Sequence, residues 1–153
     1  MTSRRAFLGG GLVLVAGAGF YAAGGRNLFY SVLTEAIAGE AIDAPTAHKL
    51  AKDQKITLVD IRRPDEWAKT GSGESAVRID MRRDDFIAEL EKITGGDRSK
   101  PVALICARGV RSARMNNRLT QAGFTNIIDV PEGMLGSASG PGWIKRGLPL
   151  DKS

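Results

Sequence analysis

The sequence has little with which to build disulfides, metal centres or aromatic surfaces. Its 153 residues include one cysteine and one histidine, and only 6% of them are aromatic. A single cysteine excludes a disulfide within the chain, and one cysteine with one histidine is too small a set for a zinc site built from this chain alone. We therefore expect no metal site, and nothing in the sequence indicates another cofactor.

A strong excess of one charge is also lacking. Twenty-two Lys and Arg face 17 Asp and Glu, which gives a formal net charge of +5. The first 38 residues hold three of the cations and one anion, so the remainder carries 19 positive and 16 negative side chains. This mild and mixed balance does not indicate nucleic acid as a partner. A composition of 42% hydrophobic and 25% charged residues is that of one globular domain, and it excludes a mainly disordered, collagen-like or coiled-coil protein.

The N-terminal segment predicts an export signal. Residues 6–25 contain seven glycines and no charged side chain, and they are flanked by Arg4-Arg5 and Arg26. A paired arginine followed by a weakly apolar, glycine-rich run resembles a twin-arginine signal, which a receptor reads as an address. The alternative is a weak transmembrane anchor, since about twenty apolar residues just span a bilayer as a helix. Both interpretations make the remaining domain periplasmic, free or anchored facing the periplasm, with membrane contact only through residues 1–26.

The remainder of the chain predicts a linker at 27–43 and one domain at 44–153. In the linker, apolar residues recur at helical spacing and also predict an amphipathic helix: Leu28, Phe29, Val32, Leu33, Ala36 and Ile37. In the domain, short apolar runs typical of buried strands alternate with helical patterns. Strands are predicted at 56–61, 76–79, 101–106 and 127–130, and helices near 46–50, from 64, and over 84–94 and 112–122. The first of these helices has either Thr46 as its N-cap or Pro45 in its first turn. The alternation predicts an α/β domain with a largely parallel sheet.

The chemistry is expected at Cys106, where a predicted strand ends and a helix follows. Ligands of parallel α/β sheets bind at the carboxyl ends of the strands. The segment Cys106-Ala107-Arg108-Gly109-Val110-Arg111-Ser112 combines a glycine that permits a tight turn, two arginines and the positive end of a helix. These features favour the nucleophilic thiolate form of the cysteine and attract a small oxyanion. The alternative is a buried cysteine that merely ends a strand, and we prefer the functional interpretation because all these features follow within six residues.

Three segments resemble motifs of the rhodanese-type sulfurtransferases. Residues 106–112 (CARGVRS) resemble the family's cysteine loop, C-x-x-G-x-R-S. Residues 58–67 (LVDIRRPDEW) resemble its first-strand segment, D-x-R followed by a proline, acid and aromatic helix start. Residues 142–149 (GWIKRGLP) resemble its closing segment, W-x-x-x-G-L-P. The resemblance covers roughly residues 44–150, and it fails at 71–76, where GSGESA stands in place of the usual G-H-I-x-G-A.

The resemblance implies a rhodanese-like fold, a small parallel sheet flanked by helices, and a persulfide mechanism. The Cys106 thiolate would take the outer sulfur of an anionic donor such as thiosulfate and pass it to a thiol or a cyanide-like acceptor. A protein sulfur acceptor or reductant is a further candidate partner. The resemblance also implies a persulfide-binding loop whose backbone N–H groups surround the sulfur, with Arg108 facing donor or acceptor and Arg111 held against a carboxylate. The loop residues are Ala107, Arg108, Gly109, Val110 and Arg111, and the supporting residues are Asp60, Arg62 and Ser112.

Other functions remain open at this point. A rhodanese-like domain can also be a sulfur carrier or a protein-binding module that does not turn over a small substrate. A phosphatase or an arsenate reductase is less favoured: the related phosphatases use a longer C-x5-R loop, whereas Cys106 to Arg111 is C-x4-R, and arsenate reduction usually needs a second cysteine. The segment 131–142, rich in Gly and Ser, is expected to be a mobile flap beside the site or a plain surface loop.

Overall fold

The structure, a computed structural model, describes residues 25–153 and, within them, all side chains except those of 26–28. The predicted signal or anchor thus lies almost wholly outside the described residues. Within the described part of the chain, no helix is both long and apolar enough to cross a bilayer. Short elements follow one another in the order α2 (Arg26–Leu33), β1 (Glu40–Ala41), α3 (Ala44–Lys52), β2 (Thr57–Asp60), α4 (Pro64–Thr70), β3 (Ser72–Gly73), β4 (Val77–Arg78), α5 (Phe86–Thr94), β5 (Val102–Ile105), α6 (Val110–Gln121), β6 (Ile127–Asp129) and β7 (Leu150–Asp151).

A five-stranded sheet forms the centre of the domain. Its strand order is β1-β6-β5-β2-β4, and every neighbouring pair is parallel. All four residues of the central strand β5 are buried, as expected for a parallel strand that is covered on both faces. The prediction of an α/β domain with a parallel sheet flanked by helices is confirmed.

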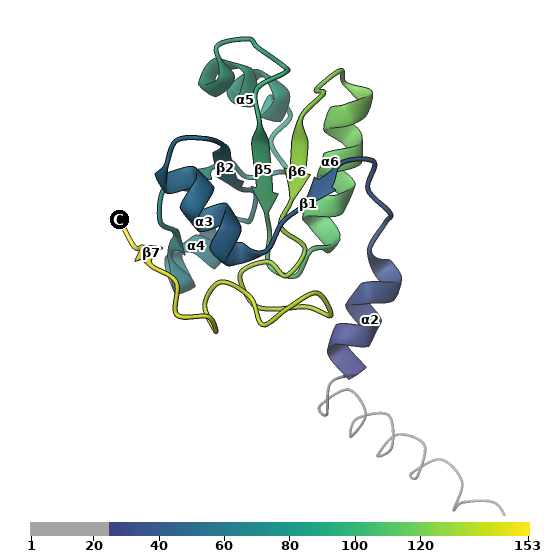
Figure 1. Cartoon of the computed structure of the whole chain (residues 1–153), viewed down its shortest axis with the longest axis vertical. Coiled ribbons are helices and arrows are strands. Elements are labelled where there is room, and N and C mark those ends of the chain that lie inside the picture. The colour runs from purple at the N-terminus through teal and green to yellow at the C-terminus, as the bar shows by residue number, and fades with distance from the viewer. Residues whose placement is uncertain (1–24) are drawn as a thin grey trace, which may run out of the picture.

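Each face of the sheet packs against its own hydrophobic cluster. On one face, side chains of β2 and β5 pack with α5 and α6, through residues such as Phe86, Leu90 and Leu119. On the other face, the small residues Ala44, Ala47 and Ala51 let α3 lie close to the sheet beside the C-terminal Trp143. Figure 1 shows the central strands pointing toward the long segment that follows β6, so this segment lies at their carboxyl ends.

Two helices begin earlier than the sequence pattern predicted, because of their caps. The Asp43 side chain accepts a hydrogen bond from the Thr46 backbone N–H at 2.9 Å, so α3 begins at Ala44 with Pro45 in its first turn. Thr46 is therefore not the N-cap. Helix α6 begins at Val110 rather than Ser112, since Gly109 is its N-cap in a left-handed conformation.

The hydrophobic pattern of the sequence did not predict three short strands, β1, β3 and β7. Strand β1 lies within residues 27–43, the stretch predicted as a linker, and pairs Glu40 with Ile128 of β6. Strands β3 and β7 form a separate antiparallel pair in which Ser72 faces Asp151. Two residues are too few to show alternation, and only their partners fix them as strands. The helix predicted in the linker is present as α2, but it ends at Leu33.

Candidate active site

The cysteine loop connects β5, at the centre of the sheet, with α6. Cys106 directly follows β5, and its side chain is buried. Gly109 has a φ of +86°, and a Cβ atom there would collide with the carbonyl oxygen of Pro131. Only glycine meets both conditions, and the turn that it makes brings the start of α6 back toward the sulfur.

Polar groups of the loop surround the sulfur atom. The Gly109 backbone N–H donates a hydrogen bond to Cys106 Sγ at 3.2 Å, and the Ser112 hydroxyl oxygen lies 3.5 Å from Sγ. Ser112 Oγ also donates to the Gly109 carbonyl oxygen at 3.1 Å, which fixes the turn. The sulfur therefore lies at the N-terminus of α6, where the helix dipole and backbone donors favour negative charge.

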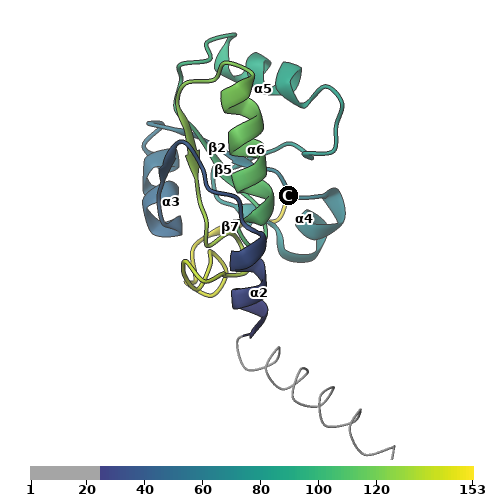
Figure 2. The same ribbon diagram turned by 90° about the vertical axis from the view of Figure 1, so that its right-hand side faces the viewer.

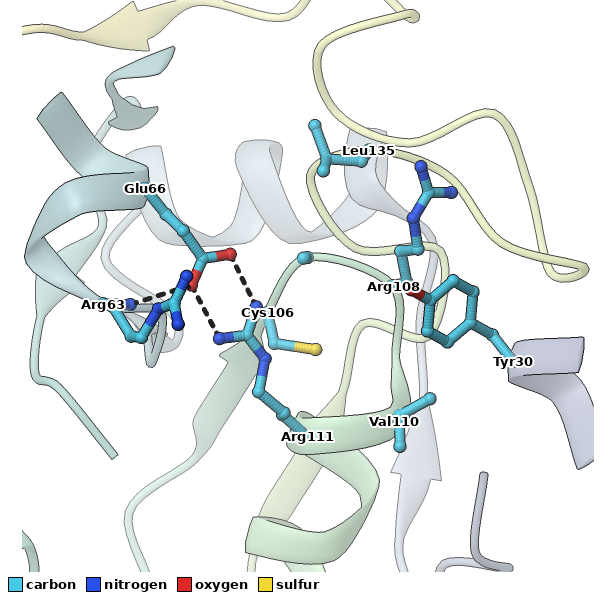
Figure 3. A pocket seen from close by; sticks show the side chains of 9 residues that line it. Tyr30, Arg63, Glu66, Cys106, Arg108, Val110, Arg111 and Leu135 are labelled. Carbon is cyan, nitrogen blue, oxygen red and sulfur yellow. Dashed lines mark hydrogen bonds and ion pairs between the residues drawn. The ribbon is translucent and has the colours of Figure 1, made fainter. Parts of the chain in front are cut away.

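Arg111 is held against Glu66 at the side of the loop. Its two terminal nitrogens donate to the two oxygens of the Glu66 carboxylate, each at 2.7 Å, as the dashed lines of Figure 3 show. Burial by itself raises the pKa of Glu66, but the hydrogen bonds from Arg111 and from the Arg63 backbone N–H, together with the charge of Arg111, outweigh it and lower this pKa to about 2. The same bonds raise the pKa of Arg111. Both groups are ionised near neutral pH, so the fork-shaped pair fixes the orientation of the guanidinium.

A pocket of about 430 Å³ opens over the cysteine. Four elements or loops contribute to it, and its lining residues are Tyr30, Arg63, Glu66, Cys106, Ala107, Arg108, Val110, Arg111 and Leu135. Five of them belong to the predicted loop. Sequence patterns missed the other four, because they come from α2, the start of α4 and the segment after β6 (Figure 3).

The segment 131–142 is fastened to the cysteine loop. The backbone N–H groups of Met134 and Leu135 donate to the carbonyl oxygens of Cys106 and Ala107 at 2.8 and 2.9 Å. Arg108 Nη1 donates to the carbonyl oxygen of Gly136 at 2.8 Å. Gly133, with a φ of +64°, lies so close to Ala107 that a Cβ would collide with its carbonyl group. The segment thus forms the support of the loop rather than a separate flap.

The buried side chain of Glu132 fixes this supporting segment to other parts of the domain. Its buried carboxylate accepts hydrogen bonds from the backbone N–H groups of Ala44 and Gly142, at 2.7 and 2.8 Å, and from Arg146 Nε at 2.8 Å. A buried carboxylate is stable when its lone pairs are satisfied in this way. One side chain therefore joins the start of α3, the supporting segment and the C-terminal turn.

The predicted supporting pair Asp60 and Arg62 lies outside the pocket lining. Both side chains are buried, and Arg62 Nη2 lies 2.7 Å from Asp60 Oδ2. Arg62 also donates to the Gly71 carbonyl oxygen at 2.7 Å, and Ser72 Oγ donates to Asp60 at 2.7 Å. The pair thus fastens the end of β2 to the residues that follow α4, and its contacts are structural.

These features define a class of protein: a parallel α/β sheet with a buried cysteine in a glycine-containing loop that begins a helix at the carboxyl edge. The family model of the rhodanese-like domain matches residues 43–138. The chain belongs to the rhodanese-like domain family.

Two relatives match the chain over part of their own length. The tRNA uridine(34) hydroxylase of Prochlorococcus marinus is 29% identical over 102 residues, which cover 63% of this chain and 33% of the hydroxylase. The uncharacterized protein YibN of Escherichia coli K12 is 29% identical over 108 residues, covering 68% of this chain and 66% of YibN. The matched part of the chain thus spans a third of the first relative and just under two thirds of the second.

A solved structure of similar size agrees in fold. The polysulfide-sulfur transferase of Wolinella succinogenes, a homodimer in solution, is 27% identical and superposes with a TM-score of 0.57. The match covers 88% of each chain. It therefore extends well beyond the residues that the family model matches in this chain.

Proposed function

We propose that the protein is a sulfurtransferase that moves a sulfane sulfur from an anionic donor such as thiosulfate to a thiophilic acceptor through a persulfide on Cys106. One observation carries the proposal: the only thiol of the chain accepts a hydrogen bond from the Gly109 N–H and faces a pocket lined by three arginines. Membership of the rhodanese-like family and the likeness to a polysulfide-sulfur transferase support it.

The first half of the reaction loads the cysteine. The Cys106 thiolate attacks the outer sulfur of thiosulfate, a new S–S bond forms, and the bond between the outer sulfur and the sulfonate sulfur breaks. The electron pair of that bond leaves with sulfite, and Cys106 is left as a persulfide anion. In the second half, an acceptor attacks the outer sulfur, removes it and restores the thiolate.

The surrounding groups stabilise the charge that moves through the loop. The Gly109 N–H and the start of α6 supply donors and a partial positive charge beside the sulfur. Arg111, whose charge is partly balanced by Glu66, adds a guanidinium of fixed orientation at the pocket wall. Arg108 lines the other side of the opening, and in this proposal its charge attracts an anionic donor or acceptor.

Intact-mass measurement of the full-length protein tests the proposal. Incubation with thiosulfate should add one sulfur atom, and cyanide should then remove it. The Cys106→Ser variant should gain no sulfur while keeping the wild-type unfolding transition, because the buried serine hydroxyl can accept the hydrogen bond that the Gly109 N–H donates to the sulfur.

Each outcome has a distinct meaning. A wild-type protein that is folded and reduced, yet gains no sulfur from thiosulfate or polysulfide, contradicts the proposal. Stoichiometric loading without turnover by cyanide or small thiols would identify a sulfur carrier rather than an enzyme. Sulfur gain in the serine variant would place the reactive group elsewhere.

A further inference from the structure

Helix α2 contributes to the pocket although it lies outside the matched domain. The family model begins at residue 43, whereas α2 covers Arg26–Leu33. Its Tyr30 lines the same pocket as Cys106, and the ring centroid lies 5.5 Å from the guanidinium carbon of Arg108. Figure 3 shows the ring beside the Arg108 side chain, at the edge of the pocket opposite Glu66. One wall of the candidate active site thus comes from a helix that the family pattern does not include.

This helix is fastened to α6, the helix that begins at the cysteine loop. Figure 2 shows α2 at the foot of α6, and the two helices are in contact. Just after α2, the Glu35 carboxylate pairs with Arg114 at 3.4 Å, and Asn117 Nδ2 donates to the Ala36 carbonyl oxygen at 3.0 Å. Phe29 also packs edge-on against the Tyr30 ring at 5.6 Å. These contacts hold Tyr30 at the pocket.

The pocket has two chemically different parts. The inner part contains the sulfur of Cys106 and the Arg111–Glu66 pair. The outer part, away from Glu66 and the neighbouring Arg63 in Figure 3, is lined by Tyr30, Arg108, Val110 and Leu135, which combine one aromatic ring and two aliphatic side chains with one cation. A volume of about 430 Å³ lies in the range of cavities that bury an organic molecule, and an inorganic sulfur oxyanion would fill only the inner part.

We infer that Tyr30 is a specificity-determining residue that, with Arg108, selects an organic thiol bearing a carboxylate, of small-peptide size, as the sulfur acceptor. The inference rests on the proposed function, because it assigns the acceptor of the same persulfide. The apolar surfaces of the outer pocket accommodate the carbon skeleton of such a thiol, while Arg108 supplies the charge that a carboxylate requires. Arg108 is itself oriented between the Tyr30 ring and the Gly136 carbonyl oxygen.

The transfer step balances without a further reactant. The acceptor sulfur forms a bond to the outer sulfur of the Cys106 persulfide, and the bond between this outer sulfur and Sγ breaks. The electron pair of the broken bond stays on Sγ as the thiolate. The proton of the acceptor thiol moves to the transferred outer sulfur, so the acceptor leaves as a neutral hydropersulfide.

Selectivity kinetics on the full-length protein test the role of Tyr30. The probes are glutathione, a peptide thiol with carboxylates, and cyanide, which fills none of the outer pocket. In Tyr30→Ala the ratio of kcat/KM for glutathione to kcat/KM for cyanide should fall about tenfold, since the ring wall and its contact with the arginine are lost. Tyr30→Phe keeps the ring and should keep the ratio. Val32→Ala, on the exposed side of the same helix, is the matched control and should also keep it.

The outcomes separate this inference from the proposed function. Absence of thiosulfate-dependent sulfur gain in the wild-type protein would refute the function itself. A wild-type protein that loads and transfers sulfur, together with a Tyr30→Ala ratio within twofold of the wild-type ratio, would refute only the role of Tyr30. An equal fall in Val32→Ala would show a general effect of α2 and would also overturn it.

Discussion

Two arginine–carboxylate pairs of this domain have the same contact distance and different surroundings. Asp60–Arg62 and Glu66–Arg111 each have a closest N–O distance of 2.7 Å. The first pair is completely buried and joins residues two positions apart. The second is partly exposed, with 28% of the Arg111 side chain and 18% of the Glu66 side chain accessible, and joins residues 45 positions apart.

The different burial of the two pairs corresponds to different roles: one stabilises the fold and the other lines the pocket. The remaining donors of Arg62 are used by Thr70 and Gly71, so this guanidinium is satisfied by the fold. Arg111 instead uses the Glu66 carboxylate to fix one edge of its guanidinium, while the pair as a whole lines the pocket. A charge that serves a substrate has to border the cavity, whereas a charge that serves the fold does not.

Breaking the buried pair should have the largest effect on stability. Arg62→Met leaves the Asp60 carboxylate buried without its partner, and we expect the free energy of unfolding to fall by about 3–5 kcal/mol. Urea denaturation measures this loss. The double variant Asp60→Asn/Arg62→Met removes the orphaned charge and should recover part of it. A loss below about 1 kcal/mol in the single variant would show that the pair does not stabilise the fold.

Asp129 is a buried carboxylate without an arginine partner among the side chains that the structure describes, and it can be compared with Asp60, whose charge Arg62 balances. Burial raises the pKa of Asp129 to about 6, and its Oδ1 has no hydrogen-bond partner among the described residues. A raised carboxyl pKa means that the fold disfavours the ionised form, so stability falls as the pH rises from about 4 through 6.

Asp129→Asn should remove this pH dependence. The free energy of unfolding of the variant minus that of the wild-type protein should be about 3 kcal/mol larger at pH 8 than at about pH 4. Urea denaturation of both proteins at the two pH values measures this difference. Asp85→Asn is the control and should change in the opposite direction, because the hydrogen bonds and charge of Arg83 lower the pKa of this exposed carboxylate. A difference for Asp129→Asn that does not vary with pH would contradict the expectation.

Breaking the Glu66–Arg111 pair should have the smallest effect on stability of the three changes, but it should strongly slow sulfur loading of Cys106. Arg111→Ala should lower the free energy of unfolding by about 1 kcal/mol, since the pair is only partly buried. The rate of sulfur gain from thiosulfate should fall about a hundredfold, and by less than about tenfold in Arg108→Ala, because Arg111 fixes the loop. Arg83→Ala, in an exposed pair with Asp85, is the matched control. A larger loss in Arg108→Ala would reverse the assigned roles.

The sequence predicts the parts of this protein that are local. The alternating strands and helices, and the loop from Cys106 to Ser112, are contiguous patterns that short-range propensities and capping encode. The resemblance to the rhodanese motifs also implies a carboxylate against Arg111. It did not identify Glu66, which the fold brings to the loop from 45 positions away.

The tertiary structure alone decides which residues share the pocket with Cys106. Tyr30 and Leu135 carry no local signal, and the edge strands β1 and β7 are too short to show one. In the same way, the spacing of Asp60 and Arg62 matches a motif, but only packing shows that the pair is buried and away from the cavity. The physical reason is that a backbone propensity depends on neighbours in sequence, whereas burial, pocket walls and shifted pKa values depend on which distant side chains the closed fold brings into contact.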